Sequence, residues 1–97
     1  MDLAITFTSP GNGGREHPPD LRNGLYRPHI VVDGRPRDEY LGVLFMGCSV
    51  APEFGVEVLV TVRLPYEQVD YSPLKVGASF VIKEGGREVG SGRVVKL

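Results

Sequence analysis

Glycine and proline are spread along the whole chain, and together they leave no room for a long helix. The sequence holds 13 glycines and 8 prolines among its 97 residues. The longest segments free of both are residues 1–9 and 56–64. A helix interior loses about 1 kcal/mol for each glycine and about 3 kcal/mol for each proline. The sequence therefore excludes a helical bundle and predicts short strands joined by turns and loops.

The clearest strand pattern lies in residues 56–64, where apolar and polar side chains alternate. Side chains of a strand point to its two faces in turn, so one face is expected to be apolar and buried. That face holds Val56, Val58, Val60, Val62 and Leu64. The same alternation near the start of the chain involves Leu3, Ile5 and Phe7. Apolar runs predict four further strands, in residues 25–33, 40–46, 78–83 and 88–97.

The last two of these strands are joined by the strongest hairpin signal in the chain. Gly85 and Gly86 stand between the two apolar runs, and glycine adopts the positive φ that tight hairpin turns require. A β-branched residue at Gly86 is therefore expected to damage the turn. Gly90 and Gly92 interrupt the final strand, which predicts a bulge or a sharp bend there.

Six strands of this kind favour closure into a barrel, because closure removes the sheet edges that promote aggregation. The predicted fold class is all-β, a six-stranded antiparallel closed β-barrel. Residues 9–24 and 65–77 are expected to be long loops, which in a compact domain are often functional. No composition shift divides the chain, so we expect a single complete domain, residues 1–97.

Composition points to a globular protein of the cytoplasm. Apolar residues make up 41% of the chain and charged residues 24%, which are globular averages. No apolar run approaches the roughly 20 residues of a membrane-spanning helix, and residues 1–8 do not resemble a signal peptide. Cys48 is the only cysteine, so no internal disulfide can form. We therefore expect a cytoplasmic location and no membrane association.

Motifs for catalysis, metal binding or nucleotide binding are missing from the sequence. His17 and His29 have no further ligands at metal-binding spacing, so no metal or other cofactor is expected. The glycine-rich segments 11–14 and 90–92 lack the pattern of a phosphate-binding loop, which predicts no nucleotide site. Cys48 is interpreted as an inert, half-buried thiol, although a neighbouring histidine would make it a candidate nucleophile. The sequence predicts a protein that is not an enzyme.

Arginine dominates the basic residues, and five of the eight arginines fall within residues 15–37. Arginine binds phosphate through two parallel hydrogen bonds, so such a cluster could hold a nucleic-acid backbone. Acidic residues are interleaved with the arginines, however, and the net charge of the chain is −1. Charge alone therefore favours a solvated surface of mixed sign over a nucleic-acid site.

A short motif occurs twice, as residues 13–16 and 85–88, each reading Gly-Gly-Arg-Glu. With these segments in view, the chain resembles the C-terminal β-barrel domain of bacterial and organellar elongation factor Tu. Residues 80–95 are similar to the closing hairpin of that family, Phe-x-Ile-Arg-Glu-Gly-Gly-Arg-Thr-Val-Gly-Ala-Gly-Val-Val. Residues 13–18 and 26–28 follow its Gly-Gly-Arg-His-Thr-Pro and Gly-Tyr-Arg-Pro motifs in the same order, and residues 58–64 match its Val-Val-Thr-Leu strand. The resemblance spans about nine-tenths of the chain.

The resemblance implies a six-stranded barrel that binds and does not catalyse. In the family this domain docks on the GTPase domain, receives the exchange factor and touches the T-stem backbone of aminoacyl-tRNA. Carried over residue by residue, Arg15, Gly86 and Arg87 become candidate RNA contacts, with Arg27 in a structural role. The chain departs from the family where Glu16 replaces a histidine, in residues 29–38 and in the longer loop 65–77. The GTPase domain and the middle barrel are missing from this sequence.

Three functions follow from these observations. The first is a binding module for a protein partner linked to translation, such as a translation GTPase, an exchange factor or a toxin that targets them. Tyr66 and Tyr71 in loop 65–77 are its candidate interface residues, because tyrosine is enriched in protein interfaces. The alternative is a weak RNA-binding module that retains the contact with the T-stem of aminoacyl-tRNA. The third is an enzyme of unknown type that uses Cys48.

Overall fold

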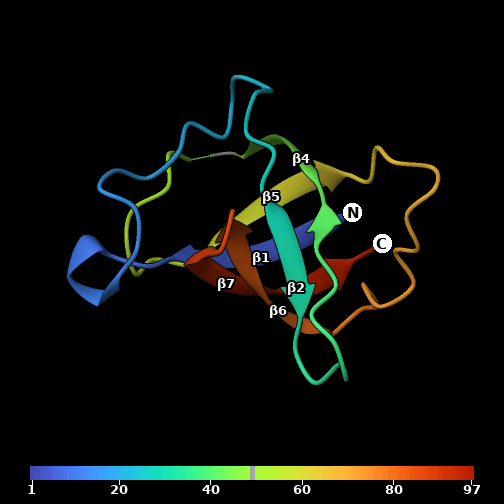
Figure 1. The fold of residues 1–97 in the computed structure, drawn as a ribbon. Coiled ribbons are helices and arrows are strands. Elements are labelled where there is room, and N and C mark those ends of the chain that lie inside the picture. Colours follow the sequence, from blue (N-terminus) through green and yellow to red (C-terminus); the bar gives the residue numbers. More distant parts are fainter. Residues whose placement is uncertain (49) are drawn as a thin grey trace.

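The protein is an all-β domain in which short strands form one strongly curled antiparallel sheet (Figure 1). The computed structural model describes residues 1–48 and 50–97. Its strands are β1 (Asp2–Phe7), β2 (His29–Val32), β3 (Leu41–Gly42), β4 (Leu44–Cys48), β5 (Val58–Arg63), β6 (Ser79–Glu84) and β7 (Arg87–Lys96). One turn of 3-10 helix, Pro10–Asn12, follows β1. Among the described residues there is no helix with the length and apolar character needed to span a membrane.

The expected closed barrel of six strands is wrong in both strand number and closure. The sheet has seven strands in the order β3-β2-β6-β7-β1-β5-β4, so β3 and β4 form its two edges. These edges are consecutive in the chain, because the strand predicted at residues 40–46 is divided at Val43. The N–H of Val43 donates to Pro28 O at 3.1 Å, and the N–H of Phe45 donates to Tyr26 O at 3.1 Å. The chain therefore runs from one edge to the other, and the sheet is a half-barrel.

The other predicted strands are present with shifted ends. Val58, Val60 and Val62 are buried as the alternation predicts, and so are Leu3, Ile5 and Phe7. The pattern fails at the start of the run, because Val56 precedes β5 and is 50% exposed. The curled sheet encloses these side chains with apolar residues of the other strands, chiefly Ile30, Phe45, Phe80, Ile82, Val89 and Val94.

The bulge expected in the final strand at Gly90 and Gly92 is present directly beside Gly90, because Val89 is an extra residue of β7 between the partners of Lys83 and Ile82. A Cβ at Gly92 would lie 2.4 Å from the carbonyl oxygen of Ala4 and 2.9 Å from the ring of Phe80. Glycine is therefore required there because β1 and the core approach too closely for any side chain. The register of β7 shifts a second time at Val95, against β1.

The two long loops predicted from the sequence are present and lie at opposite ends of the sheet. Figure 1 shows residues 9–24 in blue on one side and residues 65–77 in orange on the other. We refer to residues 9–24 as the clasped loop and to residues 65–77 as the tyrosine loop. Both carry residues that the sequence marks as candidate contacts, so the way each loop is fastened decides which groups remain free.

Candidate functional site

The two Gly-Gly-Arg segments meet in space, although they are more than 70 residues apart in the chain. Arg87, at the start of β7, donates from Nε to the carbonyl oxygen of Gly13 at 3.1 Å and from a terminal nitrogen to that of Gly14. One arginine thus binds the backbone of the clasped loop at two successive carbonyls. A guanidinium suits this task, because its donors form a rigid planar fork.

Arg15 connects the same two segments in the opposite direction, because it lies in the clasped loop and binds the hairpin. Its guanidinium pairs with the Glu84 carboxylate at 2.5 Å, and its Nε donates to the carbonyl oxygen of His17 at 2.9 Å. The Tyr26 hydroxyl donates to the same Glu84 oxygen at 2.6 Å, and the guanidinium lies 5.6 Å from the centre of the Tyr26 ring. We call the contacts of Arg15, Tyr26, Glu84 and Arg87 the clasp, because they hold loop and hairpin together from both sides.

Tyr26 acts in the clasp as a hydrogen-bond donor. Burial raises the pKa of its phenol, and the hydrogen bond to the Glu84 carboxylate raises it further. Its ring packs edge-on against Phe45 at 5.2 Å and against Phe7 at 6.1 Å, measured between ring centres. Tyr26 therefore stays protonated across the physiological pH range and links the charged clasp to the core.

The third candidate RNA contact, Gly86, stands at an exposed position in the hairpin turn. A Cβ built at Gly86 meets no atom within 4 Å. The positive φ lies at Gly85, at +62°, and not at Gly86, so the expectation of backbone strain at Gly86 is wrong. The turn needs left-handed backbone at its first central residue alone. The main chain at Gly86 is open to an approaching group, whereas Arg15 and Arg87 are already bonded within the protein.

The two candidate interface tyrosines differ in how much of each remains available. The Tyr71 hydroxyl donates to the carbonyl oxygen of Gly42 at 2.6 Å, and burial raises its pKa. The ring of Tyr66 covers Gly42 on the side where a side chain would stand, since a Cβ at Gly42 would lie 2.6 Å from Cε2 of this ring. Tyr66 is 39% exposed, whereas Tyr71 is partly buried against the core. Tyr71 anchors the tyrosine loop, and Tyr66 presents a ring to solvent.

A group of exposed side chains that was not expected from the sequence lies beside Tyr66. His29 is the register partner of Gly42, which places it next to the ring that covers this glycine. The His29 ring packs edge-on against Tyr40 at 5.7 Å, and Lys83 Nζ lies 5.9 Å from the centre of the Tyr40 ring. Tyr40 is 43% exposed. Alternation along β2 could have placed His29 outward, but Tyr40 precedes β3 and carries no periodic signal.

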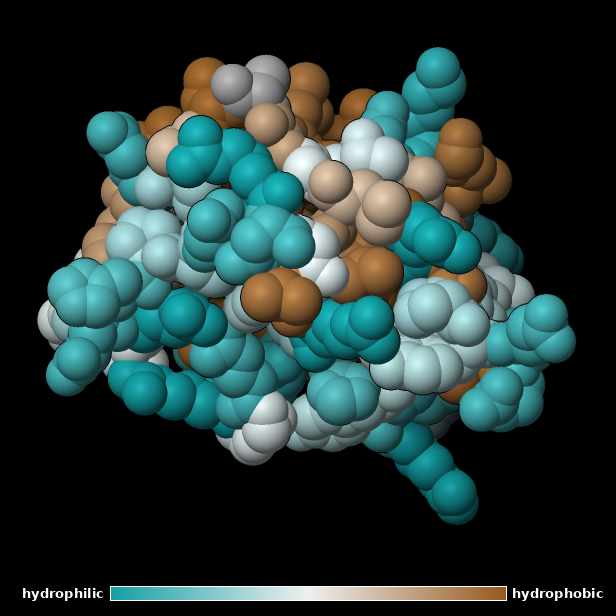
Figure 2. Space-filling view, turned by 90° about the horizontal axis from the view of Figure 1, so that it is seen from above, coloured by the Kyte–Doolittle hydropathy of each residue, from teal (hydrophilic) through white to brown (hydrophobic). Residues whose placement is uncertain are grey.

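We call His29, Tyr40 and Tyr66 the aromatic face. The three rings come from β2, the segment before β3 and the tyrosine loop, and the pairing of His29 with Gly42 places His29 beside the glycine that the Tyr66 ring covers. The space-filling view from above shows one face of the molecule, on which hydrophilic teal residues are mixed with smaller groups of apolar brown ones (Figure 2). The aromatic face consists of three rings with one cation, Lys83, beside Tyr40. It suits contact with a protein better than contact with a nucleic-acid backbone.

The candidates for catalytic or metal chemistry are Cys48 and the two histidines. No three side chains of His, Cys, Asp and Glu come together there as possible metal ligands. The half-buried Cys48 thiol lies 2.8 Å from the carbonyl oxygen of Val50. His17 belongs to the clasped loop and His29 to β2, and both are exposed.

Comparisons with known proteins add no family to these observations. A scan against models of protein families finds no match to the chain, and a search of curated proteins finds none either. The resemblance to the elongation factor Tu barrel accordingly rests on the residues quoted for it. The structure adds that this chain is an all-β domain with a curled antiparallel sheet.

Proposed function

We propose that this chain is a non-catalytic protein-binding domain of the elongation factor Tu C-terminal type, and that it binds its partner through the aromatic face. The partner is a protein of the translation machinery, such as the factor's GTPase domain or its exchange factor. The observation that carries this proposal is the exposure of Tyr66 and Tyr40 beside strand β3. Tyrosine is among the residues that most often dominate binding energy in protein interfaces.

The clasp weighs against the alternative of tRNA binding. An RNA phosphate that took the N–H groups already bonded at Arg15 would displace the Glu84 carboxylate, and at Arg87 it would displace two backbone carbonyls. Exchanging an existing charged contact for a new one yields less binding energy than filling a free site. Gly86 and Arg27 remain exposed, but they offer a single cation between them.

The aromatic face has the composition of a small interface centre. Rigid rings of two tyrosines and one histidine provide contact area at low cost in side-chain entropy, and Lys83 beside Tyr40 offers a charge for a carboxylate of the partner. The tyrosine loop is anchored at Tyr71, so the ring of Tyr66 is positioned before binding. Positioning of this kind lowers the entropic cost of association.

The proposal is tested by titrating the chain with purified elongation factor Tu, its exchange factor and aminoacyl-tRNA. We expect one of the two proteins to bind, and Tyr40→Ala and Tyr66→Ala each to weaken that binding about tenfold or more. Leu25→Ala is the matched control, because Leu25 is 76% exposed in the segment leading to β2 and lies outside the aromatic face.

Two results would overturn the proposal. Binding of neither protein at concentrations up to about 100 μM would remove the proposed partner class, since specific interfaces bind more tightly than this. Binding of tRNA that is lost in Arg15→Ala and Arg87→Ala, and that weakens steeply with salt, would establish the RNA alternative in its place.

A further inference from the structure

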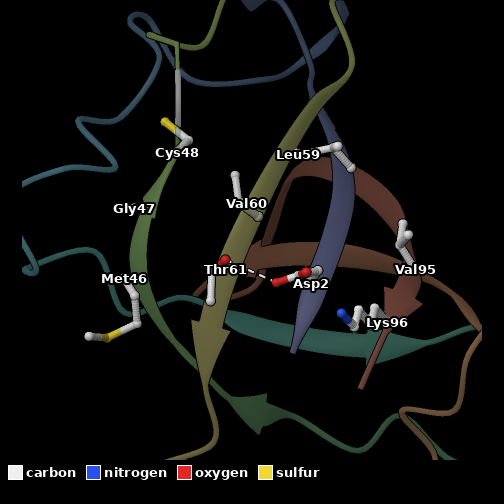
Figure 3. A pocket seen from close by; sticks show the side chains of 9 residues that line it. All are labelled: Asp2, Met46, Gly47, Cys48, Leu59, Val60, Thr61, Val95 and Lys96. Atoms are coloured by element: carbon white, nitrogen blue, oxygen red, sulfur yellow. Dashed lines mark hydrogen bonds between the residues drawn. The ribbon is translucent and has the colours of Figure 1, made fainter.

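A second exposed surface lies away from the aromatic face, on the outer side of strands β4, β5, β1 and β7. Met46, Leu59 and Val95 are 46%, 62% and 37% exposed, and we call them the apolar strip. They line one open groove of about 490 Å3, together with Asp2, Gly47, Cys48, Val60, Thr61 and Lys96. Figure 3 shows this groove with Met46 and Cys48 on one side and Leu59 and Val95 on the other.

Two residues of the strip occupy bulge positions of their strands. Phe45 pairs with Val62 and Gly47 with Thr61, so Met46 is the extra residue on β4. Val94 pairs with Leu3 and Lys96 with Asp2, so Val95 is the extra residue on β7. A bulge redirects a side chain at the expense of local pairing, and bulges are characteristic of functional sheet regions. Both bulges here leave an apolar side chain exposed, one on each side of Leu59 in the strand order.

The charged residues of the groove are one acid, Asp2, and one base, Lys96, on neighbouring strands. Asp2 and Lys96 are register partners on β1 and β7, and Asp2 accepts a hydrogen bond from Thr61 at 2.9 Å. Within residues 1–48 and 50–97 no opposite charge lies within 4.0 Å of either Asp2 or Lys96. The groove therefore carries one cation and one anion that lack ionic partners, and their charges sum to zero.

From these observations we infer that the apolar strip is the interface of a symmetric homodimer. A two-fold axis near Leu59 would place Leu59 against its counterpart and cover the Met46 and Val95 side chains of both copies. The same operation can bring Asp2 of each copy to Lys96 of the other, so that two ion pairs form at the margins of the contact. An interface of this type must be complementary to itself, and a patch with one acid, one base and an apolar centre meets that requirement.

A second copy fits this surface better than a charged partner does. The net charge of −1 gives two copies almost no electrostatic repulsion, and a strongly charged partner would leave either Asp2 or Lys96 facing a like charge. The aromatic face lies on β2, the segment before β3 and the tyrosine loop, so a dimer through the strip leaves it free on each copy. The inference is thus independent of the function proposed above.

Sedimentation equilibrium of the full chain tests the dimer directly. We expect the purified protein to show twice the monomer mass. Leu59→Arg should raise the dissociation constant at least about tenfold, because the Met46 and Val95 side chains of both copies would then face two buried arginine cations. Leu25→Arg makes the same chemical change at a residue that is 76% exposed outside the strip, and this variant should remain dimeric. A parent protein that is monomeric at about 500 μM, or a dimer that survives Leu59→Arg, would overturn the inference.

A charge exchange tests the two-fold pairing separately from the apolar contact. Asp2→Lys should weaken the dimer, because it places two lysines together in each margin, and Lys96→Asp should weaken it by pairing two acids. The double variant Asp2→Lys with Lys96→Asp should restore association to near the parent level. Weakening that adds up in the double variant would contradict the proposed symmetry.

Cys48 provides a readout that needs no substitution, because it is the only cysteine in the chain and lines the groove. Its alkylation by a maleimide should slow as the protein concentration rises through the dissociation constant. The rate in Leu59→Arg should not depend on concentration. An alkylation rate of the parent that is constant across this range would count against burial of the groove.

Discussion

The clasped loop and the tyrosine loop are each fastened to the sheet near a glycine, but by different chemistry. The clasped loop is held by charged groups, with Arg87 bonded to its carbonyls and Arg15 paired with Glu84. The tyrosine loop is held by one neutral hydrogen bond, from the Tyr71 hydroxyl to Gly42, and by the Tyr66 ring above the same glycine. The first arrangement occupies N–H groups of Arg15 and Arg87 that could otherwise bind a ligand. The second leaves a ring exposed.

This difference between the two loops does not follow from the residue types in the sequence. A repeated arginine motif suggests binding, yet in this protein its side chains serve the fold. Two tyrosines in one loop look equivalent in the sequence, yet one is an anchor and the other a surface group. The role of a side chain is decided by the partners to which it is already bonded, and these partners are often backbone atoms.

The largest effect that distinguishes the loops is expected at their glycines. A Cβ at Gly14 would lie 1.7 Å from the carbonyl oxygen of Thr8, which is backbone, whereas a Cβ at Gly42 would meet the half-exposed ring of Tyr66. Gly14→Ala should lower the free energy of unfolding by about 2–4 kcal/mol, and Gly42→Ala by less than about 1 kcal/mol, because the ring can move away. Urea denaturation of both variants measures the difference. Equal losses would show that Tyr66 is fixed as firmly as backbone.

Removal of the guanidinium at the centre of the clasp should have the next largest effect. Arg87→Ala leaves the Gly13 and Gly14 carbonyls without this donor and should cost about 1–2 kcal/mol, since exposure to water reduces the value of charged hydrogen bonds. Amide hydrogen exchange in residues 12–15 should become faster in the same variant. Arg27→Ala, which alters an exposed arginine outside the clasp, is the control and should change neither quantity.

These expectations also show how far the sequence reaches. Alternation at Val58, Val60 and Val62 predicts the buried face of β5 correctly, because period-two spacing is local information. The division of residues 40–46 at Val43 could not be predicted, since it depends on hydrogen bonds to Pro28 and Tyr26 in a distant segment. The motif repeat is visible in the sequence, but the contact between its two copies is not, because Arg87 binds carbonyls that every residue possesses. The aromatic face and the apolar strip arise from register and bulges, which no single segment encodes.

The phenol of Tyr26 provides a pH-dependent test of the clasp. Its pKa is raised in the folded protein above the ordinary value of 10.0, so above that pH the unfolded chain loses a proton that the folded protein keeps. Stability therefore falls as the pH rises above 10. Tyr26→Phe should cost about 0.5–1.5 kcal/mol at neutral pH and should flatten this alkaline decline. Urea midpoints between pH 8 and 11 measure both effects, with Tyr40→Phe as the control, and parallel curves for Tyr26→Phe and the parent would contradict the role of Tyr26.

The smallest expected effect concerns the anchor of the tyrosine loop. Tyr71→Phe removes the hydrogen bond to Gly42 and should lower the free energy of unfolding by about 0.5–1 kcal/mol while the ring keeps its packing. The variant should also weaken binding of the proposed protein partner, because Tyr66 would no longer be positioned in advance. Thermal melting and the titration described above give the two values. A binding constant unchanged from the parent would place Tyr66 outside the interface.

The pairing of the first strand with the last has a consequence for how the protein is made. β1 lies between β5 and β7, so β1 finds its earlier neighbour only after residue 63 has been synthesised and its second neighbour only after residue 96. Pairings between distant segments form late and slowly. Leu3, Ile5 and Phe7, which are buried in the folded domain, therefore lack these sheet partners while the residues up to β5 and β7 are being synthesised. Shielding of these residues by a chaperone during translation would follow from the topology alone.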